Sequence, residues 1–394
     1  MDQNRSKTYS LLSSSILSKP RMMGTPGEGE TRRFITDHLH GLGLAPHTED
    51  IQWSNAYVAA RKALVSTLIP LQLVYYLALR IGGTAGGVLS ILAPILGSLF
   101  VVILGKAVLD DRFSYLGPMS TGKNVICDLP PDGGKPHQRM IYLTAHTDSV
   151  ASTMPRLGTR LIVLAVLFFL ASTVITLVGG VFQLTGSGPG LYPLIVLELM
   201  VVDSLVIVIS LFEKRVNTSP GAVDNGSGVA ILLSLAEHFK QDPLRKSSLK
   251  FIFFAGEEWG LYGSKGYVRA HREELLERLE QDVLINVDMV GSELAFVEKA
   301  GPFFRKPLNK ELNGLISETA DQLGIEARAY STPLGNNSDH APFRKLKMET
   351  AFFLAKKDIK RIHSPQDTID GVDPDKLDEA VSLLKAVVLE LDRR

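Results

Sequence analysis

Residues 139–150 have the sequence RMIYLTAHTDSV, in which a run of apolar and β-branched residues leads directly into a histidine and an acid. Such a run is typical of a buried strand in a parallel sheet. His146 and Asp148 follow at its carboxyl end, and the alternation of side chains along a strand places both on the same side. The segment predicts a polar site at this edge of a sheet.

The chemistry of the pair suggests a metal. A metal-bound imidazole commonly donates its other N–H group to a carboxylate, so His146 is a candidate ligand and Asp148 its support. Taken alone, the pair is weak evidence for a metal site, and a surface histidine beside an acid is the default interpretation. Other segments have to decide between these two interpretations.

Two further apolar stretches end in acids. Residues 249–268, LKFIFFAGEEWGLYGSKGYV, form a β-branched and aromatic run that breaks at a glycine before Glu257 and Glu258. Adjacent carboxylates point in different directions, so one can bind a metal while the other faces the substrate water. Residues 283–292, VLINVDMVGS, end another buried strand at Asp288.

Two more segments complete a set of metal-ligand side chains. In residues 219–239, Asp224 precedes a Gly-Ser-Gly turn and an apolar-periodic helix, where capping of that helix is the alternative role. In residues 350–370, His363 follows another apolar strand. Two imidazoles and three carboxylates, with a further carboxylate left over, are the ligands expected for Zn²⁺ with positions open to water and substrate.

Composition limits the class of protein. Strand-like and helix-like stretches alternate outside the apolar runs, which predicts an α/β domain with a mostly parallel mixed sheet flanked by helices. Lysine plus arginine and aspartate plus glutamate both number 42, so no basic excess points to nucleic acid as a partner. Cys127 is the single cysteine, which excludes an intramolecular disulfide framework and a cysteine-rich zinc site.

Four long apolar runs interrupt this domain. Each approaches the roughly 20 residues that a helix needs to cross the hydrocarbon layer, whereas a buried soluble helix usually has 10–14 apolar residues and a polar stripe. We therefore expect transmembrane helices and the lipid bilayer as a partner. The runs are residues 63–79, 81–105, 161–182 and 191–212.

Short glycine-rich linkers at residues 80–87 and 183–190 pair these runs into two hairpins. The N-terminal 24 residues lack the continuous apolar core of a secretory signal, so we do not expect export. The expected organisation is one discontinuous catalytic domain of residues 1–62, 107–158 and 213–394, with transmembrane hairpins at residues 63–106 and 159–212.

Charge around the runs predicts their orientation. Basic residues flank the domain side of both hairpins, whereas only Arg80 lies at the opposite tips. The positive-inside rule then places the catalytic domain of this multi-pass membrane protein on the cytoplasmic side. Glu198 and Asp203, in the fourth run, are costly in lipid, so they either pair across helices or line a cavity. The flanking basic residues are Arg61, Lys62, Lys106, Arg112, Arg156, Arg160, Lys214 and Arg215.

Together the motifs AHxD, D(D/N)xSG, EExGLxGS, NxDM and HxxxDT resemble the M28 family of zinc aminopeptidases. Residues 21–44 also resemble the opening helix of that family. The resemblance covers almost all of the chain outside the hairpins, and five motifs in the family's order make chance improbable. It implies a zinc-peptidase-like fold, a peptide substrate and hydrolysis by a metallopeptidase of the aminopeptidase type.

The resemblance also implies roles for individual residues. Two Zn²⁺ ions per chain are expected, with Asp224 bridging them. The remaining ligands would be His146 and Asp288 on one ion and Glu258 and His363 on the other. Glu257 matches the family's general base, with Asp148 as the second catalytic residue. The bond between Asp224 and Asn225 is a candidate for the non-proline cis peptide that the family often has at this place.

Residues 335–343, GNNSDHAPF, contain another histidine. His340 is a plausible ligand by composition, but the resemblance assigns that role to His363 and places the SDH element near the substrate pocket. Asp339 and His340 are therefore predicted substrate contacts, with a structural role for His340 as the alternative.

Other functions remain in competition. A glutaminyl-cyclase-like acyltransferase shares this fold and uses one zinc ion. A non-catalytic receptor or scaffold would be built on a degenerate peptidase domain, although this chain retains all five ligands. A transporter would account for the four helices but leave the metal motifs unexplained. The hairpins bring the further hypothesis of a membrane-associated peptide as substrate.

Overall fold

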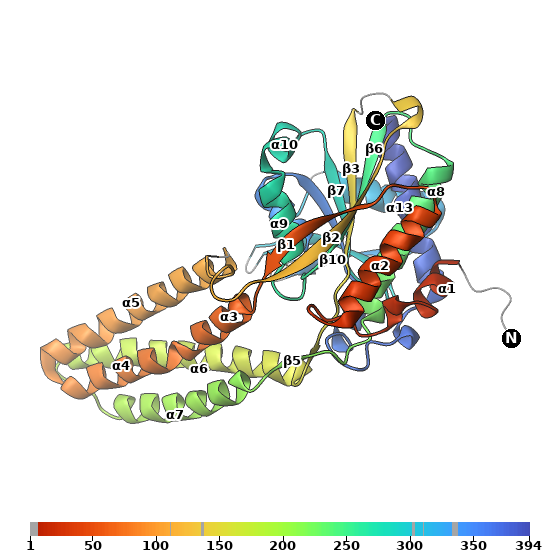
Figure 1. Cartoon of the computed structure of the whole chain (residues 1–394). Helices are drawn as coiled ribbons and strands as arrows, with labels where there is room; N and C mark the ends of the chain where they lie inside the picture. Colours follow the sequence, from red (N-terminus) through yellow and green to blue (C-terminus); the bar gives the residue numbers. More distant parts are fainter. Residues whose placement is uncertain (1–6, 111, 135–137, 302–303, 310, 333–337) are drawn as a thin grey trace. The chain divides into compact units, whose positions relative to one another are not determined.

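The computed structural model describes residues 7–110, 112–134, 138–301, 304–309, 311–332 and 338–394 (Figure 1). The chain divides into two compact units. We call the first the sheet unit, formed by Met1–Trp53, Ser120–Ala151 and Arg215–Arg394. The second, the helical unit, is formed by Ser54–Met119 and Ser152–Lys214. The predicted boundaries of the catalytic domain and the hairpins stay a prediction.

The sheet unit contains a mixed nine-stranded sheet. Its centre is the parallel group β6-β3-β7-β11, with β2 and then β1 added antiparallel on one side and β8 antiparallel on the other. β10 pairs parallel and β9 antiparallel with β8. The strands are β1 (His47–Trp53), β2 (Ser120–Leu129), β3 (Arg139–His146), β6 (Ser247–Phe254), β7 (Val283–Val287), β8 (Leu294–Ala300), β9 (Lys306–Pro307), β10 (Ala327–Thr332) and β11 (Glu349–Phe353).

Helices cover both faces of this sheet (Figure 1). The larger apolar core joins one face to α1 (Lys7–Ser13), α2 (Pro26–Gly41), α8 (Ser227–Gln241), α11 (Leu312–Leu323) and α13 (Pro374–Arg393). A smaller core joins the other face to α9 (Tyr262–Ala270), α10 (Arg272–Glu277) and α12 (His340–Lys345). Because both faces are covered, the central strands are continuous apolar runs rather than alternating ones. The predicted α/β fold class is confirmed.

Strand register brings the candidate residues to one edge. His146, the last residue of β3, is paired with Phe254, the last residue of β6. The last residue of β7, Val287, is paired with Phe353 at the end of β11. The loops that follow these parallel strands therefore begin at the same carboxyl edge of the sheet.

The helical unit contains α3 (Ala56–Ser66), α4 (Leu68–Ile81), α5 (Gly83–Leu109), α6 (Pro155–Leu184) and α7 (Tyr192–Leu211). Four helical spans are long and apolar enough to cross a membrane by length and composition: Ala56–Ile81, Gly83–Leu109, Pro155–Leu184 and Tyr192–Leu211. Large apolar side chains are exposed along all four of them. The predicted runs 63–79 and 161–182 lie within the first and third spans, and the runs 81–105 and 191–212 overlap the second and fourth spans but extend one or two residues beyond them.

The first linker is much shorter than expected. We expected residues 80–87 to connect two helices as a loop, but α4 continues to Ile81 and α5 begins at Gly83, so only Gly82 lies between them. The positive φ of 72° at Gly82 makes the turn. Gly87 serves helix packing instead, because a Cβ atom there would lie 2.8 Å from the side chain of Leu184 on α6.

The two acids of the fourth run differ in environment. Asp203 is fully buried and accepts a hydrogen bond of 2.6 Å from Nε2 of Gln72, which joins α7 to α4. Of the two alternatives for Asp203, the structure shows a polar contact between helices. Glu198 is exposed on the surface of α7.

Candidate metal centre

The loops at the carboxyl edge of the sheet bring a histidine and two carboxylates together. Nε2 of His146 lies 3.0 Å from Oδ1 of Asp224 and 3.3 Å from Oδ1 of Asp288. All three side chains are buried. His146 ends β3, Asp288 follows β7, and Asp224 lies in the loop before α8. We call these three residues the first cluster.

A second cluster shares one residue with the first. Nε2 of His363 lies 3.3 Å from Oδ2 of Asp224 and 3.0 Å from Oε2 of Glu258. In each cluster the ligand atoms lie within 4.8 Å of one another. Asp224 therefore turns one carboxylate oxygen to each cluster. The structure brings together all five residues that the sequence predicted as ligands.

The electrostatics of the clusters fit a cation. Burial lowers the pKa of His146, but Asp288 and the hydrogen-bonding carboxylates raise it more, so the net pKa lies well above its usual value. Burial raises the pKa of Glu258, and its Oε1 atom is buried without a hydrogen-bond partner in the described part of the chain. An excess of buried carboxylate oxygens beside two imidazoles is the donor set that binds zinc.

Asp224 itself is held as a carboxylate. Burial alone would raise its pKa, but hydrogen bonds from His146 and His363 lower the pKa below its usual value. The peptide bond between Asp224 and Asn225 is cis, as the family resemblance led us to expect. The Asn225 side chain donates to the carbonyl of Val287 at 2.8 Å and accepts from the N–H group of Met289. It thus ties the Asp224 loop to the segment that carries Asp288.

Asp148 supports the site differently from our expectation. Nδ1 of His146 lies 3.0 Å from the main-chain carbonyl of Asp148 and 3.7 Å from its carboxylate, so the hydrogen bond goes to the main chain. The buried carboxylate instead accepts hydrogen bonds from the N–H groups of Gly256, Glu257 and Glu258, at 3.0 to 3.2 Å. Asp148 therefore fixes the loop that carries the candidate base and one candidate ligand.

Glu257 and Glu258 occupy different environments. Glu258 belongs to the second cluster, whereas Glu257 belongs to neither cluster of the described residues and remains partly exposed. Burial of its carboxyl group raises the pKa of Glu257 well above its usual value, and the carboxylates nearby add to this effect. The arrangement matches one ligand and one separate acid, and the roles of the two residues stay predictions.

Sequence reasoning missed two supporting residues. The carboxylate of Asp367 accepts hydrogen bonds from the N–H groups of Val223 at 2.8 Å and Asp224 at 3.2 Å, and burial raises its pKa to about 7. Asp367 is the acid of the HxxxDT motif, which was the available signal. The hydroxyl of Ser338 donates to Oδ2 of Asp288 and leaves Oδ1 directed at His146.

Asp339 and His340 lie beside these residues and are fully buried. The ring of His340 stacks on Phe352 with centroids 4.3 Å apart, and burial lowers its pKa to about 3. Burial raises the pKa of Asp339 to about 7. Neither residue belongs to the two clusters, and their predicted contact with substrate stays a prediction.

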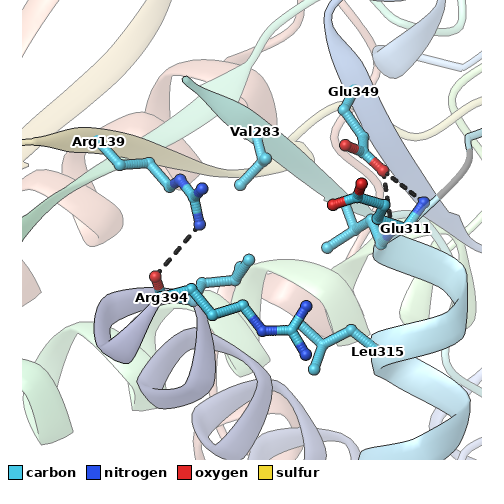
Figure 2. A pocket seen from close by; sticks show the side chains of 8 residues that line it. Arg139, Val283, Glu311, Leu315, Glu349 and Arg394 are labelled. Atoms are coloured by element: carbon cyan, nitrogen blue, oxygen red, sulfur yellow. Dashed lines mark hydrogen bonds between the residues drawn. The ribbon is translucent and has the colours of Figure 1, made fainter. Parts of the chain in front are cut away.

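A pocket at the opposite end of the sheet holds none of the candidate ligands (Figure 2). It is lined by Arg139 and Val283, the first residues of β3 and β7, and by Glu349. β3 separates Arg139 from His146 by about 23 Å, at roughly 3.3 Å per residue. The guanidinium group of Arg139 donates to the main-chain carbonyls of Gln281 and Leu391, as a structural arginine does.

The fold and the two clusters together define the class of this protein. The chain contains an α/β domain with two adjoining candidate metal sites at the carboxyl edge of its sheet. Residues 202–388 match the model of Peptidase family M28, and this range includes every predicted site residue except His146 and Asp148. Over these residues the chain is similar to this family.

The chain is also similar to several individual proteins. The chain is 32% identical over 193 residues to Aminopeptidase YwaD of Bacillus subtilis, which covers 47% of this chain and 41% of that protein. It therefore spans less than half the length of that relative. It also resembles in fold a zinc aminopeptidase from Bacillus subtilis (TM-score 0.54, 18% identity, 97% and 93% coverage). A glutaminyl cyclase from an Acidobacteriales bacterium has a similar fold (TM-score 0.55, 14% identity, 100% and 98% coverage).

Proposed function

We propose that this protein is a membrane-anchored, zinc-dependent exopeptidase of the aminopeptidase type. The observation that supports this proposal most directly is that the two carboxylate oxygens of Asp224 face different clusters. A carboxylate placed in this way can hold two ions at once. The family match and the zinc aminopeptidase among the similar folds support peptide hydrolysis rather than another metal-dependent reaction.

Each residue has a task in this proposal. His146 and Asp288 would hold one zinc ion, Glu258 and His363 would hold the other, and Asp224 would contribute one carboxylate oxygen to each. Metal bound there supplies Lewis acidity to a water molecule and to the scissile carbonyl. Glu257 takes a proton from the water and delivers it to the leaving amine.

Replacing Glu257 tests this division of labour. We expect Glu257→Gln to lower kcat by about 10²- to 10⁴-fold, the usual contribution of a general base. Both zinc ions should remain, because Glu257 lies outside the two clusters. The matched control is Glu258→Gln, which changes the neighbouring acid in the same way and should lose zinc. Zinc lost from the Glu257 variant instead would mean that base and ligand have exchanged roles.

The main competitor is a glutaminyl-cyclase-like acyltransferase, because glutaminyl cyclases are among the similar folds. An acyltransferase of this type uses one zinc ion. Only one of the two carboxylate oxygens of Asp224 would then contact a metal. One zinc ion per chain together with cyclisation of N-terminal glutamine, and no hydrolysis of aminoacyl amides, would favour the acyltransferase.

Membrane anchoring is a further part of the proposal. It is supported by the four apolar helical spans and by their exposed apolar side chains. The basic residues that flank the spans support a cytoplasmic position for the sheet unit. The expected substrate class is a peptide with a free N-terminus, and a membrane-associated peptide is the narrower hypothesis.

A further inference from the structure

Arg21 is a fully buried arginine that the proposed reaction does not use. Its guanidinium group donates hydrogen bonds to main-chain carbonyl oxygens from three separate segments of the sheet unit. Burial of an arginine is rare and costly unless its donors are satisfied. The acceptors are Leu17 at 2.7 Å, Lys19 at 2.9 Å, Thr147 at 2.9 Å, Pro220 at 2.7 Å and Gly221 at 2.9 Å.

Two of these segments carry candidate ligands. Thr147 lies between His146 and Asp148, and Gly221 lies three residues before Asp224. The planar guanidinium group reaches both segments at once, which the single ammonium group of a lysine does not do. Arg21 thus fixes the main chain on both sides of the first cluster.

Ser149 adds a second link between the same segments. Its hydroxyl accepts a hydrogen bond of 3.1 Å from the N–H group of Arg21 and donates one of 3.0 Å to the carbonyl of Ser219. Ser149 is buried as well. The N-terminal segment, the loop after β3 and the loop before Asp224 are therefore joined by one buried hydrogen-bond network.

The charge of Arg21 fits its position. Burial lowers the pKa of Arg21 to about 10, and Asp367, Asp148, Asp224 and Glu258 act in the opposite direction. The guanidinium group thus stays protonated at neutral pH, and its five hydrogen-bond acceptors are all main-chain carbonyls. It is a fixed positive charge beside the acidic clusters.

We infer that Arg21 is a positioning residue for the metal centre. It holds the loops that carry His146 and Asp224 in fixed positions relative to each other. This inference rests on the proposed function, since it assumes that the two clusters bind zinc. Residues that orient metal ligands typically contribute 10- to 100-fold to metal affinity. The N-terminal segment is then part of the metal site and not only a covering of the core.

Zinc affinity tests the inference without any assay of activity. The full-length protein is stripped of metal, and its zinc Kd is measured by competition with a chelator. We expect Arg21→Lys, which keeps the charge but cannot reach five carbonyls, to raise the zinc Kd 10- to 100-fold. Ser149→Ala, a milder change in the same network, should raise it in the same direction and provides a second variant if Arg21→Lys does not fold.

Arg139→Lys is the matched control. Arg139 also donates to main-chain carbonyls, but at the far end of β3. The zinc Kd of the Arg139→Lys variant should therefore stay within about twofold of that of the unchanged protein. Unchanged zinc Kd values in both Arg21→Lys and Ser149→Ala would overturn the inference, as would an equal loss in Arg139→Lys. Absence of zinc binding by the unchanged protein would instead refute the proposed function.

Discussion

The two carboxylate oxygens of Asp224 face two different histidines, so this one side chain links both clusters. Its place before a Gly-Ser-Gly turn fitted a helix cap as well as a ligand, and only the order of the five motifs favoured the ligand. In the structure, Oδ1 of Asp224 lies 3.0 Å from Nε2 of His146, and Oδ2 lies 3.3 Å from Nε2 of His363. Residues more than a hundred positions apart meet here, which no local pattern specifies.

The contacts of Asp148 could not have been predicted in the same way. The AHxD spacing indicated a carboxylate near His146, but the hydrogen-bond partners of that carboxylate are N–H groups of residues 256–258. Main-chain donors carry no side-chain signal, so the sequence does not reveal them. The same reason explains why the role of Asp367 was missed, although its motif was recognised.

His340 provides a pH-dependent prediction at this scale. Its pKa is about 3 in the folded protein because of burial, against about 6.5 in an unfolded chain. Below pH 6.5 the unfolded state therefore binds a proton that the folded state does not, and stability falls by about 1.4 kcal/mol per pH unit. At pH 5 the loss from this group is about 2 kcal/mol.

The measurement compares the metal-free protein with its His340→Gln variant by urea unfolding between pH 7 and pH 5. The variant should lose less stability over this range by about 2 kcal/mol, since all other titrating groups are common to both proteins. Parallel pH profiles for the two proteins would contradict a neutral, buried His340.

At the scale of the element, local sequence predicted the strands and helices well where one period dominated. The apolar runs of β3, β6 and β7 and the four long spans are examples. The prediction of a loop at residues 80–87 was wrong because glycine occurs both in turns and at close contacts between helices. Gly82 makes the turn, whereas Gly87 permits close packing of α5 on α6. Composition alone does not distinguish them.

Asp392 connects the last helix, α13, to residues 245–247 at the start of β6. Asp392 of α13 is buried, and its carboxylate accepts hydrogen bonds from the N–H groups of Arg245, Lys246 and Ser247 at 2.6 to 2.9 Å. Burial would raise the pKa of Asp392, but these three donors lower it. Asp392→Ala should lower the free energy of unfolding by about 1–3 kcal/mol at pH 7, because buried donors lose their acceptor.

The sign of the pH dependence follows from the lowered pKa. The contribution of Asp392 is present above the unfolded pKa of about 3.9 and disappears as pH falls below it, so the variant and the unchanged protein should converge in acid. Asp378→Ala, an exposed acid on the same helix, is the control and should stay within about 0.5 kcal/mol in urea unfolding. Equal effects of the two substitutions would refute this role for α13.

For the whole molecule, the sequence predicted an α/β fold and the apolar spans, and both are present. The joining of three distant segments by Arg21 was not predicted, because its acceptors are main-chain carbonyls. The orientation of the spans in a membrane is predicted from the charge around them.

Cysteine labelling tests that topology. Cys127 is buried, so it adds little background to a membrane-impermeant thiol reagent. We expect Ser187→Cys, in the exposed loop between α6 and α7, to be labelled in intact cells. Glu280→Cys, an exposed position in the sheet unit, should be labelled only after permeabilisation. The reverse pattern would place the sheet unit on the other side of the membrane.

The zinc content of the purified protein shows whether Asp224 serves two metal sites. Elemental analysis of the unchanged protein and of Asp224→Ala should give about two zinc ions per chain and almost none, respectively, because one carboxylate serves both clusters. Zinc removal by a chelator should abolish hydrolysis of aminoacyl amides, and zinc addition should restore it. A single zinc ion in the unchanged protein, or two retained in Asp224→Ala, would contradict a shared two-metal site.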